Sequence, residues 1–334
     1  MPKYTIKSIF LLFALLLQFV SLSCSKEENS KSVVKRTYTF KSDRPIIICE
    51  QLEDRVIIVD SASQNIIWEW VSAKSGLPTD HISWFKHIDE AKPIYNKKYI
   101  LVTASAGGGV AIIRISDKKV MFYACPGANT HSAEILPDGN IVVACSTDDD
   151  GTNVNANSLL IYKVDTLSSP AGSYKAKYSV YAAHNAVWDY KNQCLMATAN
   201  NNLNYYKYNF DSNNPKLILQ NIVNLPASGS HDLFPVYGED ALWLTNAVGV
   251  YKYNIATNVA TQVSFSLPTI KCVSSGPAGY GILLVQPKIS YYTDEVINSD
   301  FKRVFYGINY RIYKARWFID NPFSYGEGSD FIQP

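Results

Sequence analysis

The sequence predicts an all-β protein whose strands form a six-bladed β-propeller. Short runs of β-forming residues, bounded by Gly, Asn, Asp and Pro, fill the chain, and no segment keeps the 3.6-residue period of an amphipathic helix. A unit of about 40 to 50 residues recurs, which is the length of a propeller blade. Tyrosine, at 23 of 334 residues, supports the prediction because aromatic rings are favoured in half-buried strands.

The first 23 residues predict a signal peptide. Lys3 and Lys7 precede a short apolar run over residues 9–20, whereas a membrane-spanning helix needs about 20 apolar residues. The following Ser21-Leu-Ser-Cys24 resembles the lipobox of bacterial lipoproteins, although Ser21 stands where leucine is usual. This resemblance implies cleavage before Cys24 and lipidation of its thiol. An ordinary secretory signal with an incidental cysteine is the alternative.

The next segment predicts a tether and a location. We expect a lipidated Cys24 and a flexible tether over residues 24–44, followed by a single propeller domain over residues 45–334. The Ser-Lys-Glu-Glu after Cys24 resembles the export signal of surface lipoproteins in the Bacteroidota. It implies anchoring to the outer membrane, at its outer surface or otherwise on its periplasmic face. Without residues 1–23 the chain has 29 Lys and Arg against 29 Asp and Glu, so it lacks the basic footprint of nucleic-acid binding.

The two ends of the domain predict how the ring of blades closes. Three strand-like runs, at residues 46–50, 55–60 and 66–70, have no inner strand before them. The run at residues 311–318 looks like an inner strand with no blade after it. Pairing this run with the first three closes the ring and leaves no sheet edge exposed. Seven blades are the alternative, with an extra strand hidden in residues 33–45.

Between the two ends, each unit begins near a histidine, except the last, which begins near Lys271. The segment that begins at each histidine is the first run of its unit; after a polar turn come a run of small and β-branched residues and then two further apolar runs. Four strands per unit is the number in a propeller blade. The spacings between successive histidines are 44, 53 and 47 residues. These histidines are His87, His131, His184 and His231.

Two sets of segments resemble known propeller families. Residues 55–60, Arg-Val-Ile-Ile-Val-Asp, and residues 67–70, Ile-Trp-Glu-Trp, resemble blades of quinoprotein-like and arylsulfotransferase-like propellers. The segments that begin at His131, His184 and Gly229 resemble an uncharacterised family of Bacteroidota propeller lipoproteins. The resemblance covers most of residues 45–318. It implies the fold and no particular activity.

The histidines are the candidate functional site. The inner strands of a propeller line its central channel, so we expect the four histidines to meet at one mouth of that channel. In the other two blades the matching positions fall near Lys271 and Lys314, which would complete a cationic arc. Trp84, flanked by His81 and His87, is the candidate platform on which a ligand could stack.

Three hypotheses for this histidine ring stay open. The histidines could be structural and hydrogen-bond the backbone of a neighbouring blade. They could coordinate a divalent ion such as zinc, manganese or nickel, because neutral imidazole is a common metal ligand. They could form, with the lysines, a rim that binds an anionic or sugar ligand and offers an acid or base near neutral pH. The metal ligands would be His87, His131, His184 and His231.

Other polar features carry weaker signals. Acidic residues beside the histidines could fix a tautomer or lie in solvated loops. Five cysteines remain besides Cys24, without a Cys-x-x-Cys pair, so a zinc–cysteine site is not expected; a single disulfide is allowed. Residues 148–155 are expected to form a polar loop instead of a calcium site, and residues 105–110 a hairpin turn. The acidic residues are Asp89, Glu90, Glu134 and Asp232.

These observations favour a cell-envelope lipoprotein whose propeller binds a small ligand, such as a glycan fragment, at the His- and Lys-lined mouth of its channel. One alternative is a metal-dependent lyase or hydrolase of acidic saccharides that uses the same histidines. Another is a non-catalytic scaffold for protein interactions. The residues leave open whether the protein is an enzyme. The expected partners are a membrane, reached through the lipid on Cys24, and a glycan or another small molecule.

Overall fold

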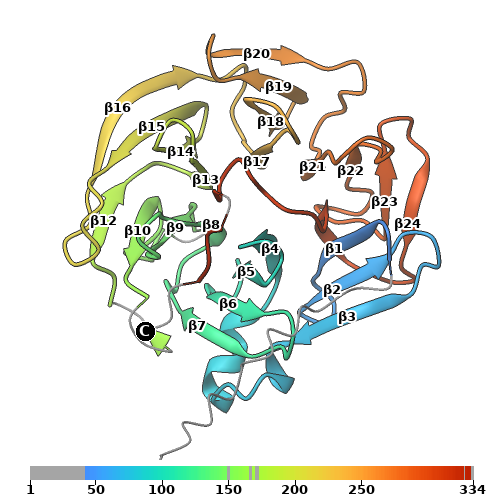
Figure 1. Ribbon diagram of the computed structural model, residues 1–334, viewed down its shortest axis with the longest axis horizontal. Helices are drawn as coiled ribbons and strands as arrows, with labels where there is room; N and C mark the ends of the chain where they lie inside the picture. Colours follow the sequence, from blue (N-terminus) through green and yellow to red (C-terminus); the bar gives the residue numbers. More distant parts are fainter. Residues whose placement is uncertain (1–41, 149–150, 165–167, 170–172, 327, 332–334) are drawn as a thin grey trace, which may run out of the picture. The chain divides into compact units, whose positions relative to one another are not determined.

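The strands form six antiparallel sheets around a central axis in the computed structural model, which describes residues 42–148, 151–164, 168–169, 173–326 and 328–331 (Figure 1). Each sheet is one blade of a propeller, and its innermost strand comes first along the chain in every blade except blade 1. The predicted six-bladed propeller is therefore confirmed. The proposed signal peptide, Cys24 and most of the tether lie outside the described residues, as do residues 33–41, where a seventh blade would have needed its extra strand.

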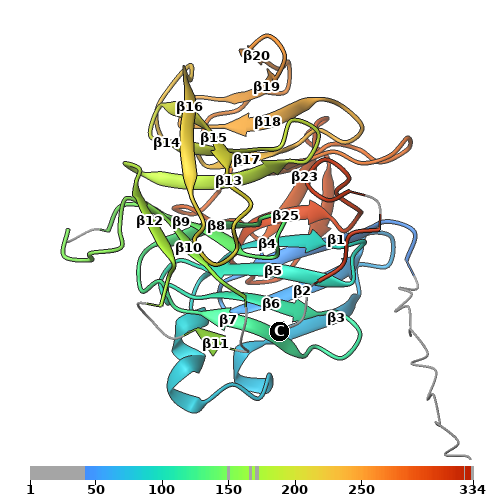
Figure 2. The same cartoon turned by 60° about the vertical axis from the view of Figure 1, so that its left-hand side comes forward.

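Blade 1 closes the ring as predicted, because the last strand of the chain pairs with the first. The order β25-β1-β2-β3 places the C-terminal strand innermost, and Figure 2 shows β25 beside β1. The backbone N–H of Phe318 donates to Pro45 O at 2.8 Å, and that of Gln51 donates to Arg311 O at 2.9 Å. The strands are β25 (Ile312–Trp317), β1 (Pro45–Glu50), β2 (Arg55–Asp60) and β3 (Ile66–Val71).

Blades 2 and 3 follow in chain order, and an additional short strand, β11, pairs in parallel with the outer strand of blade 2. Blade 2 contains β4 (Ile88–Ile94), β5 (Tyr99–Ala104), β6 (Val110–Arg114), β7 (Val120–Ala124) and β11 (Ser168–Ser169). Blade 3 contains β8 (Thr130–Ile135), β9 (Ile141–Cys145), β10 (Ser158–Tyr162) and β12 (Ala176–Ser179).

Blades 4, 5 and 6 complete the ring with the same meander from inner to outer strand. Blade 4 contains β13 (Ala183–Asp189), β14 (Cys194–Ala199), β15 (Asn202–Tyr208) and β16 (Leu217–Asn224). Blade 5 contains β17 (Asp232–Pro235), β18 (Ala241–Thr245), β19 (Val250–Asn254) and β20 (Val259–Gln262). Blade 6 contains β21 (Cys272–Ser274), β22 (Leu283–Val285), β23 (Glu295–Asn298) and β24 (Arg303–Tyr306).

Two short 3₁₀ helices, η1 (Ser72–Lys74) and η2 (Thr79–Phe85), connect blade 1 to blade 2. Helix η2 lies against the β5–β6 turn, where a Cβ atom on Gly107 or Gly109 would come within 2.5 Å of Trp84 O. Glycine is therefore required for this close approach. Residues 105–109 connect two strands, as the sequence predicted. No helix in the described part of the chain is long and apolar enough to cross a membrane.

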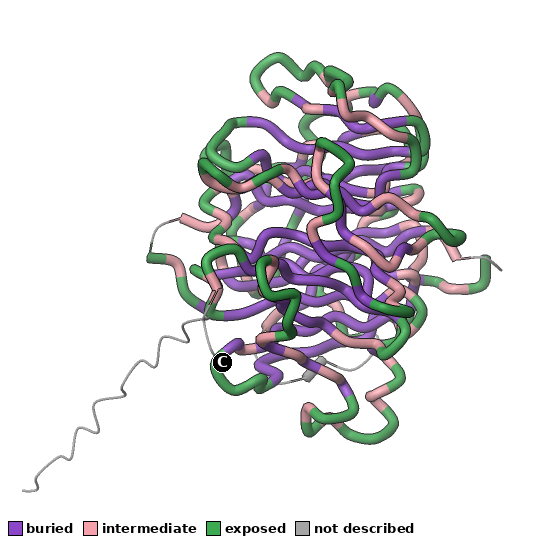
Figure 3. The backbone as a smooth tube through the Cα atoms, turned by 90° about the vertical axis from the view of Figure 1, so that its right-hand side faces the viewer, coloured by how far each residue is buried: buried purple, intermediate pink, exposed green. Residues whose placement is uncertain are grey.

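The hydrophobic core lies between the blades. Six clusters of buried side chains occur, each with members from two adjacent blades. Figure 3 shows the buried strands between exposed connecting loops. The described cysteines are all free, and most are buried within this core. Five tryptophans pack there, each at most 4% exposed: Trp68, Trp70, Trp188, Trp243 and Trp317.

Truncating Trp317 is expected to destabilise the closed ring. Trp317 lies on the closing strand, and its indole Nε1 donates to Gly281 O at 2.7 Å. We expect Trp317→Ala to lower the free energy of unfolding by about 3–5 kcal/mol in urea denaturation, because the variant loses buried apolar area and leaves a cavity. Trp84→Ala is the control and should cost less, because Trp84 is only partly buried. Equal losses in the two variants would contradict the expectation.

Candidate functional site

Strand register places one polar side chain of each blade in the same layer at the start of the inner strands. Three blades have a β-bulge at the start of the inner strand, and one residue is left unpaired in each bulge. These residues are Asp89 in β4, His131 in β8 and His184 in β13. The matching residue in the other blades directly precedes β17 or β21, or is the second residue of β25. We call this set the polar ring; its members are Asp89, His131, His184, His231, Lys271 and Tyr313.

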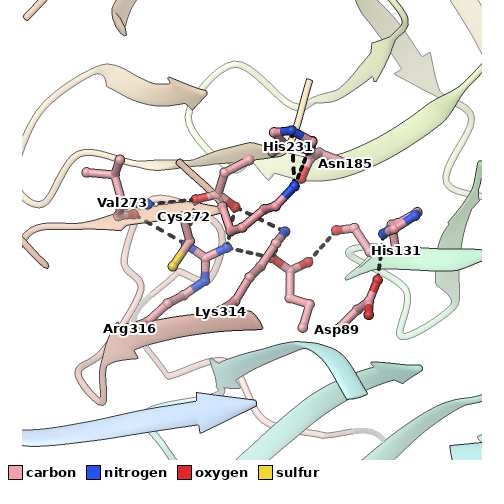
Figure 4. Close-up of polar contacts among 12 residues, drawn as sticks. Asp89, His131, Asn185, His231, Cys272, Val273, Lys314 and Arg316 are labelled. Atoms are coloured by element: carbon pink, nitrogen blue, oxygen red, sulfur yellow. Dashed lines mark hydrogen bonds and ion pairs between the residues drawn. The ribbon is translucent and has the colours of Figure 1, made fainter. Parts of the chain in front are cut away.

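The members of the polar ring contact their neighbours in sequence around the channel. His131 Nδ1 lies 2.6 Å from Asp89 Oδ2 (Figure 4), and the His131 ring stacks on His184 at a centroid distance of 3.8 Å. His184 meets His231 edge to face at 5.9 Å. Lys271 Nζ lies 3.2 Å from His231 Nε2. Three of the four predicted ring histidines are therefore brought together, along with Lys271.

Burial and neighbouring cations keep two of these histidines neutral. The pKa of His231 is lowered to about 3, by burial first and then by the positive charges of Lys271 and Lys314. Burial also lowers the pKa of His184 well below its ordinary value, and the adjacent histidines add to the effect. At neutral pH both imidazoles can therefore donate one hydrogen bond and accept one.

Beneath the polar ring, a cluster of six paired charges fills the channel. Arg316 donates to Glu90 Oε1 and to Asp232 Oδ1, each at 2.6 Å. Lys314 Nζ lies 3.3 Å from Glu90 Oε1 and 3.2 Å from Asp232 Oδ1. Lys92 lies between Glu90 and Glu134, at 3.4 and 3.5 Å. We call this set the ionic plug; its members are Lys92, Lys314, Arg316, Glu90, Glu134 and Asp232, each at most 1% exposed.

Neighbouring charges hold Glu90 and Arg316 of the ionic plug in their charged forms. Although burial alone would raise it, the pKa of Glu90 is lowered by the surrounding cations Lys314, Lys92 and Arg316. The carboxylates of Glu90 and Asp232 in turn raise the pKa of Arg316 against the effect of its burial. Three cations face three carboxylates, so the plug pairs its charges internally and blocks the channel below the polar ring.

The C-terminal segment covers the opposite end of the channel. It continues from β25 across the centre of the ring, in red in Figure 1. The Tyr325 hydroxyl donates to Glu134 in the plug, and Phe323 O accepts the backbone N–H of Tyr190. Phe331 packs against Tyr99 of blade 2, with centroids 5.3 Å apart. The polar ring is therefore accessible from one mouth.

A recess of about 540 Å³ opens at that mouth. The ring members Asp89, His131 and Tyr313 form part of its wall. Amide, hydroxyl, carboxyl and aromatic side chains form most of the remainder, which includes Gln51, His87, Ser105, Asn129, Asp148, Asn153 and Tyr291. A larger pocket of about 690 Å³ lies elsewhere, between blades 1 and 6, and contains none of the predicted site residues.

Two predicted members of the ring occupy other places. His87 was aligned with His131, but it precedes β4 by one residue, and Asp89 has the matching position; His87 still lines the recess. The backbone N–H of His87 donates to Asp54 Oδ1 at 2.6 Å, and its φ is 55°. Lys314 was expected at the rim, but Tyr313 occupies that position. Lys314 lies one residue further along β25, in the ionic plug.

Trp84 and His81 do not line the recess. Their rings stack at a centroid distance of 3.8 Å, and His81 Nδ1 lies 2.9 Å from the hydroxyl of Tyr123, on the outer strand of blade 2. Trp84 also packs against the core between blades 1 and 2. The expected ligand platform at Trp84 is therefore absent from the recess wall, and Tyr291 and Tyr313 are the aromatic residues there.

The metal hypothesis finds no ligand set in this geometry. Among the described residues, no group of three or more His, Cys, Asp or Glu side chains is placed to hold a metal ion. The rings of His131 and His184 stack with centroids 3.8 Å apart and an interplanar angle of 20°, so their in-plane lone pairs lie in nearly parallel, separate planes. The loop proposed as a calcium alternative includes residues 149–150, which lie outside the described part of the chain.

Sequence reasoning missed the ionic plug. Its acids were expected to orient histidines or lie in solvated loops, yet Glu90, Glu134 and Asp232 are buried among cations. A signal was present, because Lys92, Lys314 and Arg316 all interrupt runs assigned to inner strands. Charged residues are rarely fully buried unless they are paired, so charges on several inner strands indicate mutual pairing.

The neutral histidines predict a loss of stability in acid. The folded state has a His231 pKa near 3, and the unfolded chain has one near 6.5, so only the unfolded state gains this proton between those values. Stability should therefore fall as the pH drops below about 6.5. In urea denaturation, lowering the pH from 7.5 to 5 should reduce the free energy of unfolding of His231→Asn by about 1–2 kcal/mol less than it reduces that of the wild type. Equal slopes in the wild type and in His231→Asn would refute this role for His231.

The fold is shared with a solved structure of low sequence identity. A protein of unknown function from Bacteroides caccae superposes with a TM-score of 0.53 and 14% identity, over 82% of this chain and 98% of that chain. A functionally unknown protein from Desulfotomaculum acetoxidans gives a TM-score of 0.46 and 11% identity, over 80% of this chain and 96% of that chain. No curated protein matches the chain. The sequence model of a family of unknown function, DUF6528, matches residues 6–333, and the chain therefore belongs to DUF6528.

Proposed function

We propose that the propeller binds a small hydroxylated ligand, such as a glycan fragment, in the recess above the polar ring. The observation that carries this proposal is the layered channel: each blade supplies one polar side chain at the same level, three of these side chains line the recess, and the ionic plug lies below. A concave site with convergent polar groups is where small molecules generally bind.

The chemistry of the recess suits a ligand with many hydroxyl groups. Gln51, Asn129 and Asn153 offer amides that both donate and accept, and Asp148 offers a carboxylate that accepts. Tyr291 and Tyr313 lie with ring centroids 6.3 Å apart and present aromatic surface with a polar end. A sugar has the same combination of hydroxyl groups and apolar ring faces.

Buried polar atoms without partners support the same conclusion. Within the described residues, neither His184 Nε2 nor Asn185 Oδ1 has a hydrogen-bond partner. Such atoms cost free energy unless something satisfies them, so a polar ligand or ordered water is expected beside them. The proposed location is the cell envelope; the signal-like residues 1–23 and the lipobox-like Cys24 support it.

Removing an aromatic wall of the recess should weaken binding. A glycan array probed with the wild-type protein identifies a ligand, and isothermal titration calorimetry measures its affinity. We expect Tyr291→Ala to weaken that affinity about three- to tenfold, because the ligand loses ring contact. Tyr181→Ala is the matched control, since Tyr181 is 65% exposed and does not line the recess. A wild-type protein that binds no glycan would count against the proposal and favour a scaffold role.

A second candidate function is acid–base catalysis on the bound ligand. The specific observation is the contact between His131 and Asp89, both of which line the recess. Asp89 is itself held by Gln51 Nε2 at 3.0 Å and Ser105 Oγ at 2.8 Å. A buried carboxylate beside Nδ1 leaves Nε2 as the nitrogen that exchanges a proton with a substrate.

Catalysis and binding are separable by substitution. If the protein is an enzyme, mass spectrometry should show conversion of an array-positive glycan. His131→Asn should then reduce the rate about 10²–10⁴-fold while glycan affinity changes less, because a general base acts on the chemical step. Asp89→Asn should retain more activity than His131→Asn. An unchanged glycan after prolonged incubation with the wild-type protein would leave binding as the function.

A further inference from the structure

Lys271 differs from the other buried cations of the channel because no carboxylate pairs with it. Its side chain is 7% exposed, and its backbone N–H is fixed by Val285 O at 2.9 Å. The groups around Nζ are the His231 ring, with Nε2 at 3.2 Å and Nδ1 at 3.4 Å, and the Tyr313 ring, with its centroid at 5.7 Å. Within the described residues, no acidic side chain forms an ion pair with it.

The contrast with the ionic plug makes this position unusual. Lys92, Lys314 and Arg316 each contact at least one buried carboxylate. In the polar ring the carboxylate is Asp89, which already contacts His131 and accepts from Gln51 and Ser105. Each cation of the plug therefore contacts a carboxylate, whereas the ring keeps a cation that no acid in the ring contacts.

An unpaired cation at this depth lowers the stability of the fold. The pKa of Lys271 is lowered to about 8, first by burial and then by the positive charge of Lys314, while Asp89 opposes the shift. His184 and His231 are neutral and add no negative charge. Between pH 8 and the ordinary lysine pKa, the unfolded chain holds a proton that the folded chain releases, so stability rises with pH across that window. At neutral pH, Lys271 is mostly charged and unfavourable for folding.

Lys271 does not itself line the recess but lies beside Tyr313, which does. We infer that the ligand of the recess carries an anionic group, such as the carboxylate of an acidic sugar, and that this group reaches past Tyr313 to pair with Lys271. The inference rests on the proposed function and adds the charge of the ligand to it. Neutral His231 places a possible hydrogen-bond donor beside the same anion. Because proteins tend to retain a locally unfavourable group where it serves binding, the ligand is the missing partner of this cation.

A stability measurement separates a functional Lys271 from a structural one. Lys271→Met keeps an unbranched side chain of similar length without the charge. We expect this variant, without ligand at pH 7, to unfold at the same or a higher temperature than wild type. Lys191→Met is the control, because Lys191 is an exposed lysine paired with Asp240 near the opposite end of the channel. A clear drop in the unfolding temperature of Lys271→Met alone would overturn the inference, since it would show that the fold needs this charge.

Matched neutral and acidic sugars test the ligand charge. Sodium D-glucuronate and D-glucose are titrated into the wild-type, Lys271→Met and Lys191→Met proteins, with calorimetry for affinity. Side-chain NMR follows the Lys271 pKa, with the resonance assigned by its absence from Lys271→Met. We expect glucuronate to bind wild type and Lys191→Met at least about tenfold more tightly than glucose, to raise the Lys271 pKa, and to lose this advantage in Lys271→Met.

The remaining outcomes distinguish the two proposals. Equal binding of both sugars to all three proteins would overturn the role of Lys271 and leave sugar binding standing. Failure of both sugars to bind, with an unmoved Lys271 pKa, would count against both proposals. If acetate raised the Lys271 pKa as much as glucuronate does, anion binding would be supported and the preference for a sugar would not.

Discussion

Arg316 holds the carboxylates of Glu90 and Asp232 together at the centre of the propeller, and the arrangement of the blades depends on this contact. Arg316 belongs to blade 1, Glu90 to blade 2 and Asp232 to blade 5. Asp232 also accepts the backbone N–H of Val273 in blade 6 at 3.1 Å. Lys92 donates to Ala133 O in blade 3 at 2.9 Å and to Ala186 O in blade 4 at 2.7 Å. All six inner strands are therefore connected through one group of buried charges.

This arrangement couples closure of the ring to the contents of the channel. Strand β25 supplies both the pairing that joins the chain ends and two of the three cations in the ionic plug. Buried charges are costly unless their partners are correctly placed, so the plug favours the register in which every cation meets a carboxylate. The polar ring lies directly above the plug, at the starts of the same strands. Its geometry is consequently set by contacts that no ligand needs to touch.

Much of the fold could be predicted from the sequence because a propeller repeats its strands at near-constant intervals. The three unpaired runs after residue 45 and the solitary run near Ile312 were enough to predict the closure. The members of the polar ring were harder to predict. Glu90 follows His87 by three residues, and Glu134 follows His131 by three, so the two segments align by similarity. The bulges instead match Asp89 with His131, and an offset of two residues in an inner strand leaves no trace in the sequence.

The ionic plug could not be predicted, because its partners come from distant parts of the chain. Arg316 and Asp232 are 84 residues apart, and only closure of the ring brings them into contact. A charged residue in an apolar run is equally consistent with an exposed strand edge until its partners are known. The same limit hid the special position of Lys271. The sequence does not show which groups the nearby carboxylates contact, so it cannot show that Lys271 has no acidic partner.

The plug and the C-terminal segment that crosses behind it have a consequence for how any ligand moves. In the part of the chain that the structure describes, the plug and this segment fill the far end of the channel, so a polymer would not thread through it, and a small molecule or the free end of a chain is what can reach the histidines. A ligand would enter and leave through the same opening, so its residence time in the channel would depend on that opening. For a glycan, this geometry selects chain termini over internal units.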